Sequence, residues 1–127
     1  MQARATVASG DLAGLDDHAL VARVLAGHRE AFRHIMQRCN QRLFRVARSV
    51  LRNDQEAEDV LQESYLRAYR KLDTFRGDAT LLTWLTIIVL NEARGRLRKR
   101  HNMVELDQVD LAQDDSHVVA FRARSGS

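Results

Sequence analysis

Proline is absent from this sequence of 127 residues, cysteine occurs once, and glycine occupies six positions. A chain without proline and with little glycine favours long uninterrupted helices over a turn-rich sheet. A single cysteine excludes an internal disulfide, and the N-terminus lacks the charged and apolar regions of a signal peptide. The longest apolar run, LTIIVL, is too short to span a bilayer. These absences predict a soluble cytoplasmic protein with no membrane insertion.

The residue patterns that catalysis and metal binding require are also missing. Glu58 and Asp59 are adjacent, so they do not face each other on a helix. No glycine-rich phosphate loop occurs. The histidines are scattered without metal-ligand spacing, at His18, His28, His34, His101 and His117. We therefore expect no enzyme activity, no catalytic residue, no metal and no cofactor.

Charge is strongly segregated along the chain, although the net charge is only +3. Residues 54–63 contain acids and no base, residues 91–101 are almost purely basic, and residues 104–117 are acidic again. Such segregation indicates partners better than the net charge does. The order of an acidic helix, a loop and a basic helix suggests two different partners bound side by side.

Apolar spacing predicts an all-α fold, a bundle of about four helices. The first helix follows an N-cap at Asp16 or Asp17 and ends at Gly27, and the others cover residues 29–52, 55–73 and 80–100. No segment has the clear alternation of a strand. We expect residues 1–15 to be a mobile leader, residues 16–101 to form the helical domain, and residues 102–127 to be an acidic linker or tail.

The third predicted helix has an unusual outward face. Its buried stripe is predicted to contain Ala57, Val60, Leu61, Ser64, Ala68 and Leu72. The opposite side contains Asp59, Gln62, Glu63 and Leu66, flanked by Tyr65 and Tyr69. One interpretation is a solvated acidic face. The other is an interface for a basic, helical partner, because an exposed leucine and tyrosines beside acids are typical of binding surfaces.

The fourth predicted helix has two arcs. The buried arc centres on Leu82, Leu85, Val89 and Ala93, with Leu81 and Ile88 beside it. The second arc contains Thr80, Thr83, Trp84, Ile87, Asn91, Arg94 and Arg98. Guanidinium groups can neutralise phosphates, amides and hydroxyls can bond to bases or backbone, and an indole can stack on an unpaired base. For each of these groups an alternative stays open. Trp84 either contacts DNA or belongs to the core. The arginines either contact phosphates or form a solvated helix end.

The loop before this helix, FRGDAT, lies between the acidic and basic segments. Gly77 permits a positive φ, and Asp78 is expected to cap the following helix. A short loop beside a basic groove can hold a flipped base. Taken alone, this signal has little specificity.

Three segments together resemble a known family: DDHALVARVLAGHREAFRHI, DQEAEDVLQESYLRAYRKLDTFRGDAT and TWLTIIVLNEARGRLRKR. They are similar to region 2 of the extracytoplasmic-function (ECF) sigma factors of bacterial RNA polymerase. The resemblance covers the chain from about Asp17 to Arg100. The combination of AEDVLQE, FRGDA and TWL at this spacing is specific.

The resemblance implies two partners. In that family the third helix binds the clamp helices of the polymerase β′ subunit, which maps here to Asp59, Gln62, Glu63, Tyr65 and Tyr69, with Leu66 on the same face. The loop and fourth helix bind the single-stranded, non-template −10 promoter element, with one base flipped into a pocket. This role maps to Arg76, Gly77, Asp78, Ala79 and Thr80 and, along the helix, to Asn91, Arg94 and Arg98. An anti-sigma factor is a further expected partner.

Two departures from the family pattern keep an alternative open. Thr86 and Ile87 stand where family members commonly have tyrosine and arginine, which removes one possible phosphate contact. The second domain, a helix-turn-helix that reads the −35 element, is not encoded here. The chain is therefore expected to be a region 2 fragment or a single-domain relative. The alternative function is a sigma-like interaction module that binds polymerase or an anti-sigma factor without specific DNA recognition. A double-strand repressor would need a short exposed recognition helix, which we do not find.

Overall fold

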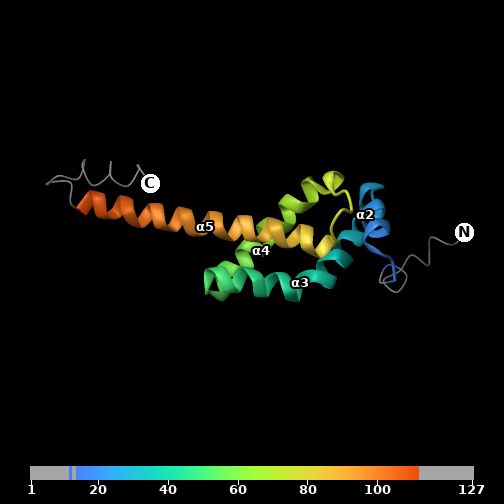
Figure 1. The fold of residues 1–127 in the computed structure, drawn as a ribbon, viewed down its shortest axis with the longest axis horizontal. Helices are drawn as coiled ribbons and strands as arrows, with labels where there is room; N and C mark the ends of the chain where they lie inside the picture. Colours follow the sequence, from blue (N-terminus) through green and yellow to red (C-terminus); the bar gives the residue numbers. More distant parts are fainter. Residues whose placement is uncertain (1–11, 13, 112–127) are drawn as a thin grey trace, which may run out of the picture. The chain divides into compact units, whose positions relative to one another are not determined.

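Helices account for the regular structure of the described residues, as the sequence predicts (Figure 1). The computed structural model describes residue 12 and residues 14–111. In chain order the elements are α2 (Asp17–Leu25), α3 (Glu30–Leu51), α4 (Asp54–Arg70), a 3-10 turn η1 (Leu72–Thr74) and α5 (Leu81–Leu111). The described residues contain no strand. The all-α fold class is thus confirmed.

Capping residues explain where these helices begin and end. Asp16 accepts a hydrogen bond from the backbone N of Ala19 at 2.9 Å, and Asn53 accepts one from the backbone N of Glu56 at 2.8 Å. Gly27, with φ of 104°, lies just after α2. Arg52 ends α3 in the left-handed region, with φ of 60°. The predicted third helix was too long at its end, because α4 stops at Arg70 and the chain continues as the turn η1.

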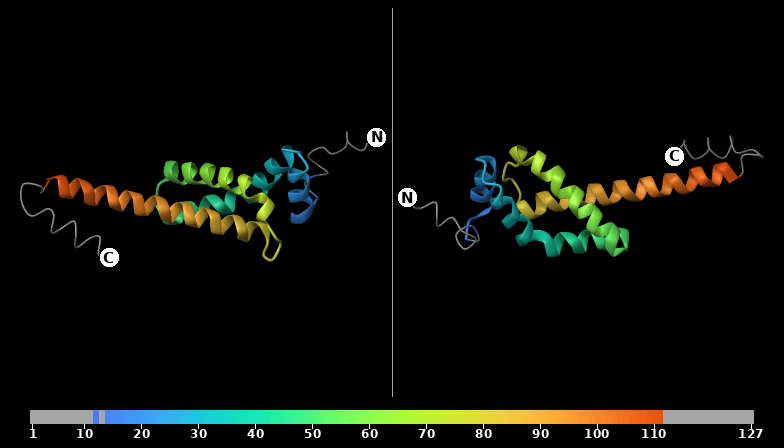
Figure 2. Two further views of the ribbon diagram at one scale, coloured as in Figure 1. Left: turned by 90° about the horizontal axis from the view of Figure 1, so that it is seen from above. Right: turned by 180° about the vertical axis from the view of Figure 1, so that it is seen from behind.

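The core of the first unit lies where α3 packs against α2 and α4. Figure 2 shows α4 crossing α3, with α2 near the start of α3. The stripe predicted for the third helix is fully buried, although its last residue, Leu72, lies in η1. Helix α5 buries Leu81, Leu85, Ile88, Val89 and Ala93. Leu82, predicted at the centre of that arc, is only half-buried. Arg67 of α4 also forms an ion pair with Glu92 of α5.

The chain divides into two units, Met1–Ala93 and Arg94–Ser127, and α5 contributes to both. The expected helix end near Arg100 is wrong, because α5 continues to Leu111. Neither glycine nor proline interrupts residues 96–111, and His101 pairs with Glu105 one turn later. The acidic composition of residues 104–111 is therefore compatible with helix.

The leader expected over residues 1–15 falls mostly outside the described residues, as do residues 112–127 of the expected tail. Leu12 is described and is buried, so the packed core reaches to this position. Across residues 12 and 14–111, no helix has both the length and the apolar character needed to cross a membrane.

Candidate nucleic-acid and protein interfaces

The loop between η1 and α5 forms the wall of a pocket of about 260 Å³. Gly77 adopts φ of 84°, a conformation that favours glycine, and so allows the chain to turn sharply there. The pocket is lined by Thr74, Phe75, Arg76, Gly77, Asp78, Ala79 and Trp84. Its volume is slightly below the range of small-molecule sites, which begins at about 300 Å³. The structure thus brings together most of the loop residues predicted to bind DNA, along with Trp84.

Trp84 forms part of this pocket wall. Its side chain is half-buried, and its ring meets that of Phe75 edge-on, with centroids 5.6 Å apart. One part of Trp84 therefore packs against Phe75 and another part lines the pocket. Its contact with DNA stays a prediction. Phe75 and Thr74 were not among the predicted site residues. Phe75 is the first residue of the loop FRGDAT, and its aromatic ring there was the available signal.

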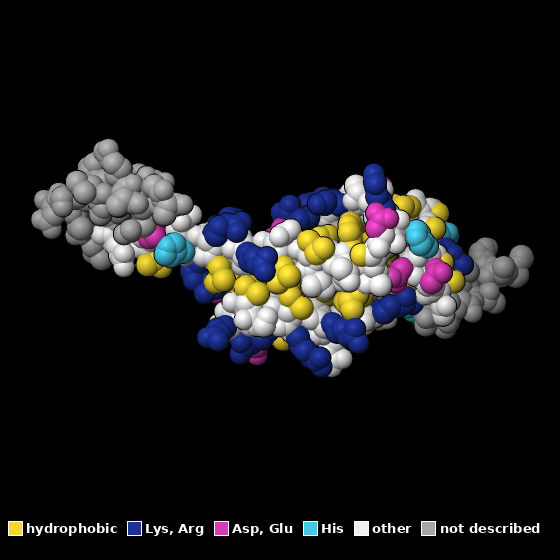
Figure 3. Space-filling view, in the orientation of Figure 1, with side chains coloured by type: hydrophobic (Ala, Val, Ile, Leu, Met, Phe, Trp, Pro, Cys, Tyr) yellow, Lys and Arg dark blue, Asp and Glu magenta, His cyan; other side chains and the backbone are white. Residues whose placement is uncertain are grey.

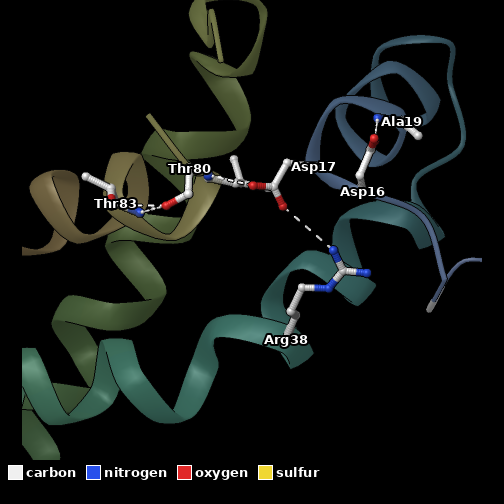
Figure 4. Close-up of polar contacts among 7 residues, drawn as sticks. Asp16, Asp17, Ala19, Arg38, Thr80 and Thr83 are labelled. Carbon is white, nitrogen blue, oxygen red and sulfur yellow. Dashed lines mark hydrogen bonds and ion pairs between the residues drawn. The ribbon is translucent and has the colours of Figure 1, made fainter. Parts of the chain in front are cut away.

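The first turn of α5 is capped by Thr80 and Asp17, as Figure 4 shows. The Thr80 hydroxyl accepts from the backbone N of Thr83 at 3.1 Å, and Asp17 accepts from the backbone N of Leu81 at 2.8 Å. The expectation that Asp78 caps this helix is wrong. Because α5 starts at Leu81, Asp78 is too far before the first turn, and it is exposed and lines the pocket instead.

The second arc of α5 is exposed within the first unit. Thr83 and Asn91 face solvent, and Ile87 is 53% exposed. Arg94 and Arg98 belong to the second unit, where both side chains are exposed. Thr83, Asn91, Arg94 and Arg98, the predicted DNA-contacting residues among these, are therefore accessible. Their role in binding stays a prediction.

The outward face of α4 is also accessible. Asp59, Gln62 and Glu63 are exposed, and the exposed fractions of Leu66 and Tyr69 are 52% and 44%. Tyr69 packs edge-on against Phe32 of α3, with ring centroids 5.2 Å apart. The contact with Phe32 holds the Tyr69 ring at the surface. The result is a half-apolar, acidic face.

Tyr65 was predicted at the border of this face, but its side chain is buried beneath it. It is 5% exposed, and its hydroxyl donates a hydrogen bond to Asn40 at 2.7 Å. Burial, with a smaller effect of Cys39 and Glu58, raises the pKa of the phenol, so Tyr65 stays neutral. Its burial leaves little surface for a partner. Tyr65 therefore joins α4 to α3 beneath the face formed by the other five residues.

A hollow between α3 and α4 extends this face in a way that was not predicted. Its volume is about 460 Å³, and it is lined by Arg33, Met36, Gln37, Asn40, Gln62 and Tyr65. Arg33, Gln37 and Asn40 follow one another at helical spacing on α3. That polar stripe was the signal in the sequence that could have identified α3 as part of the interface.

A second feature absent from the predictions is a row of exposed arginines on α3. Figure 3 shows basic side chains along the edge of the molecule where Figure 1 places this helix. The exposed arginines of α3 are Arg33, Arg38, Arg42, Arg45 and Arg48. Arg38 is 3.7 Å from Asp17, and Arg48 hydrogen-bonds Asp54 at 2.6 Å. Part of this row is therefore structural.

Comparison with known proteins matches the same part of the chain. The Sigma-70 region 2 family pattern matches residues 35–102. The ECF RNA polymerase sigma factor SigM of Mycobacterium tuberculosis is 39% identical over 95 residues, which are 73% of this chain and 48% of that protein. The ECF RNA polymerase sigma-E factor of Salmonella typhimurium is 42% identical over 103 residues, 80% of this chain and 53% of the relative. The chain thus spans about half the length of these curated relatives.

A solved structure shares the fold. It is the complex of an engineered region 2 of sigmaE with GTAAAA, determined by NMR, with a TM-score of 0.65 and 30% sequence identity. The match covers 70% of this chain and 93% of the solved chain. The helices, the loop and the matched residues therefore identify this chain as a member of the Sigma-70 region 2 family, of the kind found in ECF sigma factors.

Proposed function

We propose that this chain binds core RNA polymerase and the melted −10 promoter element, and so directs transcription initiation. The pocket formed by residues 74–79 and Trp84 is the observation that carries this proposal. The similar solved domain is in complex with GTAAAA, which supports a short single-stranded ligand for this domain too. This role requires no catalysis by the chain and implies a cytoplasmic location.

In the proposed complex, one base of the non-template strand enters the pocket. Trp84 and Phe75 provide aromatic surface, and the loop backbone provides hydrogen-bonding groups that can select the base edge. Asn91 on α5 is exposed and can contact a neighbouring nucleotide. Arg94 and Arg98 supply positive charge for phosphates, so binding is expected to weaken with salt.

Core polymerase is proposed to bind the α4 face, through the β′ clamp helices. Exposed Leu66 and Tyr69 offer apolar contact, and Asp59 and Glu63 attract basic side chains. The α3–α4 hollow adds depth to this otherwise convex surface. An anti-sigma factor that covers the same face would compete with polymerase.

Fluorescence anisotropy with labelled single-stranded oligonucleotides tests the DNA part. We expect residues 1–127 to prefer an oligonucleotide containing GTAAAA over a scrambled one at moderate salt. Replacing Arg94 and Arg98 by glutamine should weaken binding to both and reduce the slope of log Kd against log salt by about one per phosphate contact. Arg42→Gln with Arg45→Gln, the same charge change on α3, is the matched control. Equal binding to the scrambled oligonucleotide, to GTAAAA and to a set of other −10-like sequences would refute promoter-strand recognition.

The second candidate function is an interaction module that binds polymerase or an anti-sigma factor without reading DNA. The exposed Leu66 and Tyr69 favour it independently of the pocket. A pull-down of core polymerase by the wild-type chain, lost with Leu66→Ser, together with absent DNA selectivity, would support this candidate over the first.

A further inference from the structure

The start of α2 meets the start of α5 through a single carboxylate. One oxygen of Asp17 accepts the backbone N–H of Leu81 at 2.8 Å, although the two residues are 64 positions apart. The other oxygen is 3.7 Å from the Arg38 guanidinium of α3 (Figure 4). Three helices therefore meet at Asp17. Leu81 directly follows the loop, so this contact fixes where the loop ends.

The next residue, His18, touches the loop itself. A Cβ atom added at Gly77 would lie only 2.2 Å from the His18 Nε2, so the imidazole occupies the space beside this glycine. The His18 ring also lies near Phe75, with centroids 5.9 Å apart, and Phe75 contacts Trp84. Figures 1 and 2 agree that α2 lies beside the loop. His18 thus contacts two residues of the pocket wall.

We propose that Asp17 and His18 are positioning residues that hold the loop in the conformation that accepts a base. This inference rests on the proposed function of the pocket. The sign of the Asp17 charge argues for support rather than DNA contact, because a carboxylate repels phosphate. If Asp17 acted only through its charge, its removal would strengthen DNA binding. Positioning predicts the opposite.

The size of the effect follows from the fraction of molecules whose loop is correctly placed. The apparent Kd equals the intrinsic Kd divided by that fraction. Loss of a helix-capping hydrogen bond changes such an equilibrium by roughly fivefold. Asp17→Ala should therefore raise the Kd for the GTAAAA oligonucleotide by up to about fivefold and lower its preference over a scrambled sequence. Asp17→Asn keeps an oxygen for the Leu81 N–H and should stay within about twofold of wild type.

Asp16 supplies the matched control. It lies one residue earlier, carries the same charge and caps α2 through Ala19 rather than α5. Asp16→Ala therefore removes one negative charge and one helix cap without releasing the loop, and its DNA affinity should be unchanged or slightly higher. Melting curves by circular dichroism identify a temperature at which every variant is folded. Trp84, the single tryptophan, reports the loop by its emission without DNA.

A double-mutant cycle tests His18 separately. Gly77→Ala places a methyl group in the space of the imidazole, whereas His18→Ala vacates that space. If His18 supports the loop, His18→Ala alone should weaken binding, and Gly77→Ala should weaken it at least threefold more when His18 is present than when it is replaced. Additive effects would show that the two residues do not act together and would overturn the role of His18.

The remaining outcomes are distinct. Weaker and less selective binding by Asp17→Ala, with recovery in Asp17→Asn and an unchanged Asp16→Ala, would support the inference. Equal or tighter binding by Asp17→Ala, while the wild-type chain remains selective, would overturn the inference alone. A wild-type chain that does not distinguish the two oligonucleotides would overturn the proposed function and the inference with it.

Discussion

Replacement of Trp84 by leucine should weaken binding of a GTAAAA oligonucleotide far more than it destabilises the fold. Trp84 is half-buried and lines the pocket, where its ring meets Phe75. Leucine keeps hydrophobic bulk against Phe75 but removes the flat surface on which a base can stack. Stacking of a base on an aromatic side chain contributes about 1–3 kcal/mol. The lower half of this range corresponds to a Kd increase of roughly five- to thirtyfold.

Anisotropy titration at a temperature where each variant is folded measures this change. Trp84→Phe retains an aromatic ring and should lose no more than about threefold in affinity, which separates stacking from bulk. Leu25→Ala is the control for removal of an exposed apolar side chain, since Leu25 is 55% exposed on α2. If Trp84→Leu binds the oligonucleotide with wild-type affinity and selectivity, the pocket does not hold a base and the reasoning is wrong.

Three further predictions concern stability and the second interface. Arg52 has φ of 60°, so Arg52→Gly should raise the free energy of unfolding, measured in urea, by up to about 1 kcal/mol. A decrease would mean that contacts of the arginine side chain stabilise the fold by more than the backbone strain costs. Tyr65→Phe should lower the free energy of unfolding by about 1 kcal/mol and leave polymerase binding intact. Tyr69→Ala should reduce the amount of polymerase pulled down, with little loss of stability. The reverse pattern would place Tyr65 in the interface. Burial raises the pKa of the Cys39 thiol above its ordinary value of 9.0, so the folded state keeps a proton that the unfolded state loses. Stability should therefore fall as the pH rises above 9, and less steeply in Cys39→Ala; identical slopes would contradict this assignment.

Local features were predictable from the sequence because their causes are local. The caps at Asp16 and Asn53 act on amides three residues away, and the apolar spacing of α4 determines its buried stripe. The loop could be recognised from Gly77, and the structure gives it the positive φ that glycine favours. The residues of the pocket wall are also close in sequence, so most of them were identified.

Contacts between residues far apart in the sequence could not be predicted from local sequence patterns. Tyr65 lies at the border of the α4 stripe, and its burial depends on Asn40, 25 residues earlier. Asp17 is a residue type that commonly caps the helix in which it lies. Nothing in the neighbouring sequence shows that it accepts a hydrogen bond from the backbone N–H of Leu81. The end of α5 was misjudged for a different reason. Acidic residues suggested a linker, although the pairing of His101 with Glu105 is compatible with a continuing helix.

The most direct test of the account follows the Trp84 indole N–H by NMR during titration with GTAAAA. One tryptophan gives one indole signal, and the Gly77 amide provides a second probe on the pocket wall. Both signals should shift on addition of GTAAAA and stay in place with a scrambled oligonucleotide at the same salt concentration. Equal shifts with both oligonucleotides, or shifts confined to the basic residues of α5, would contradict the claim that this pocket reads a promoter base.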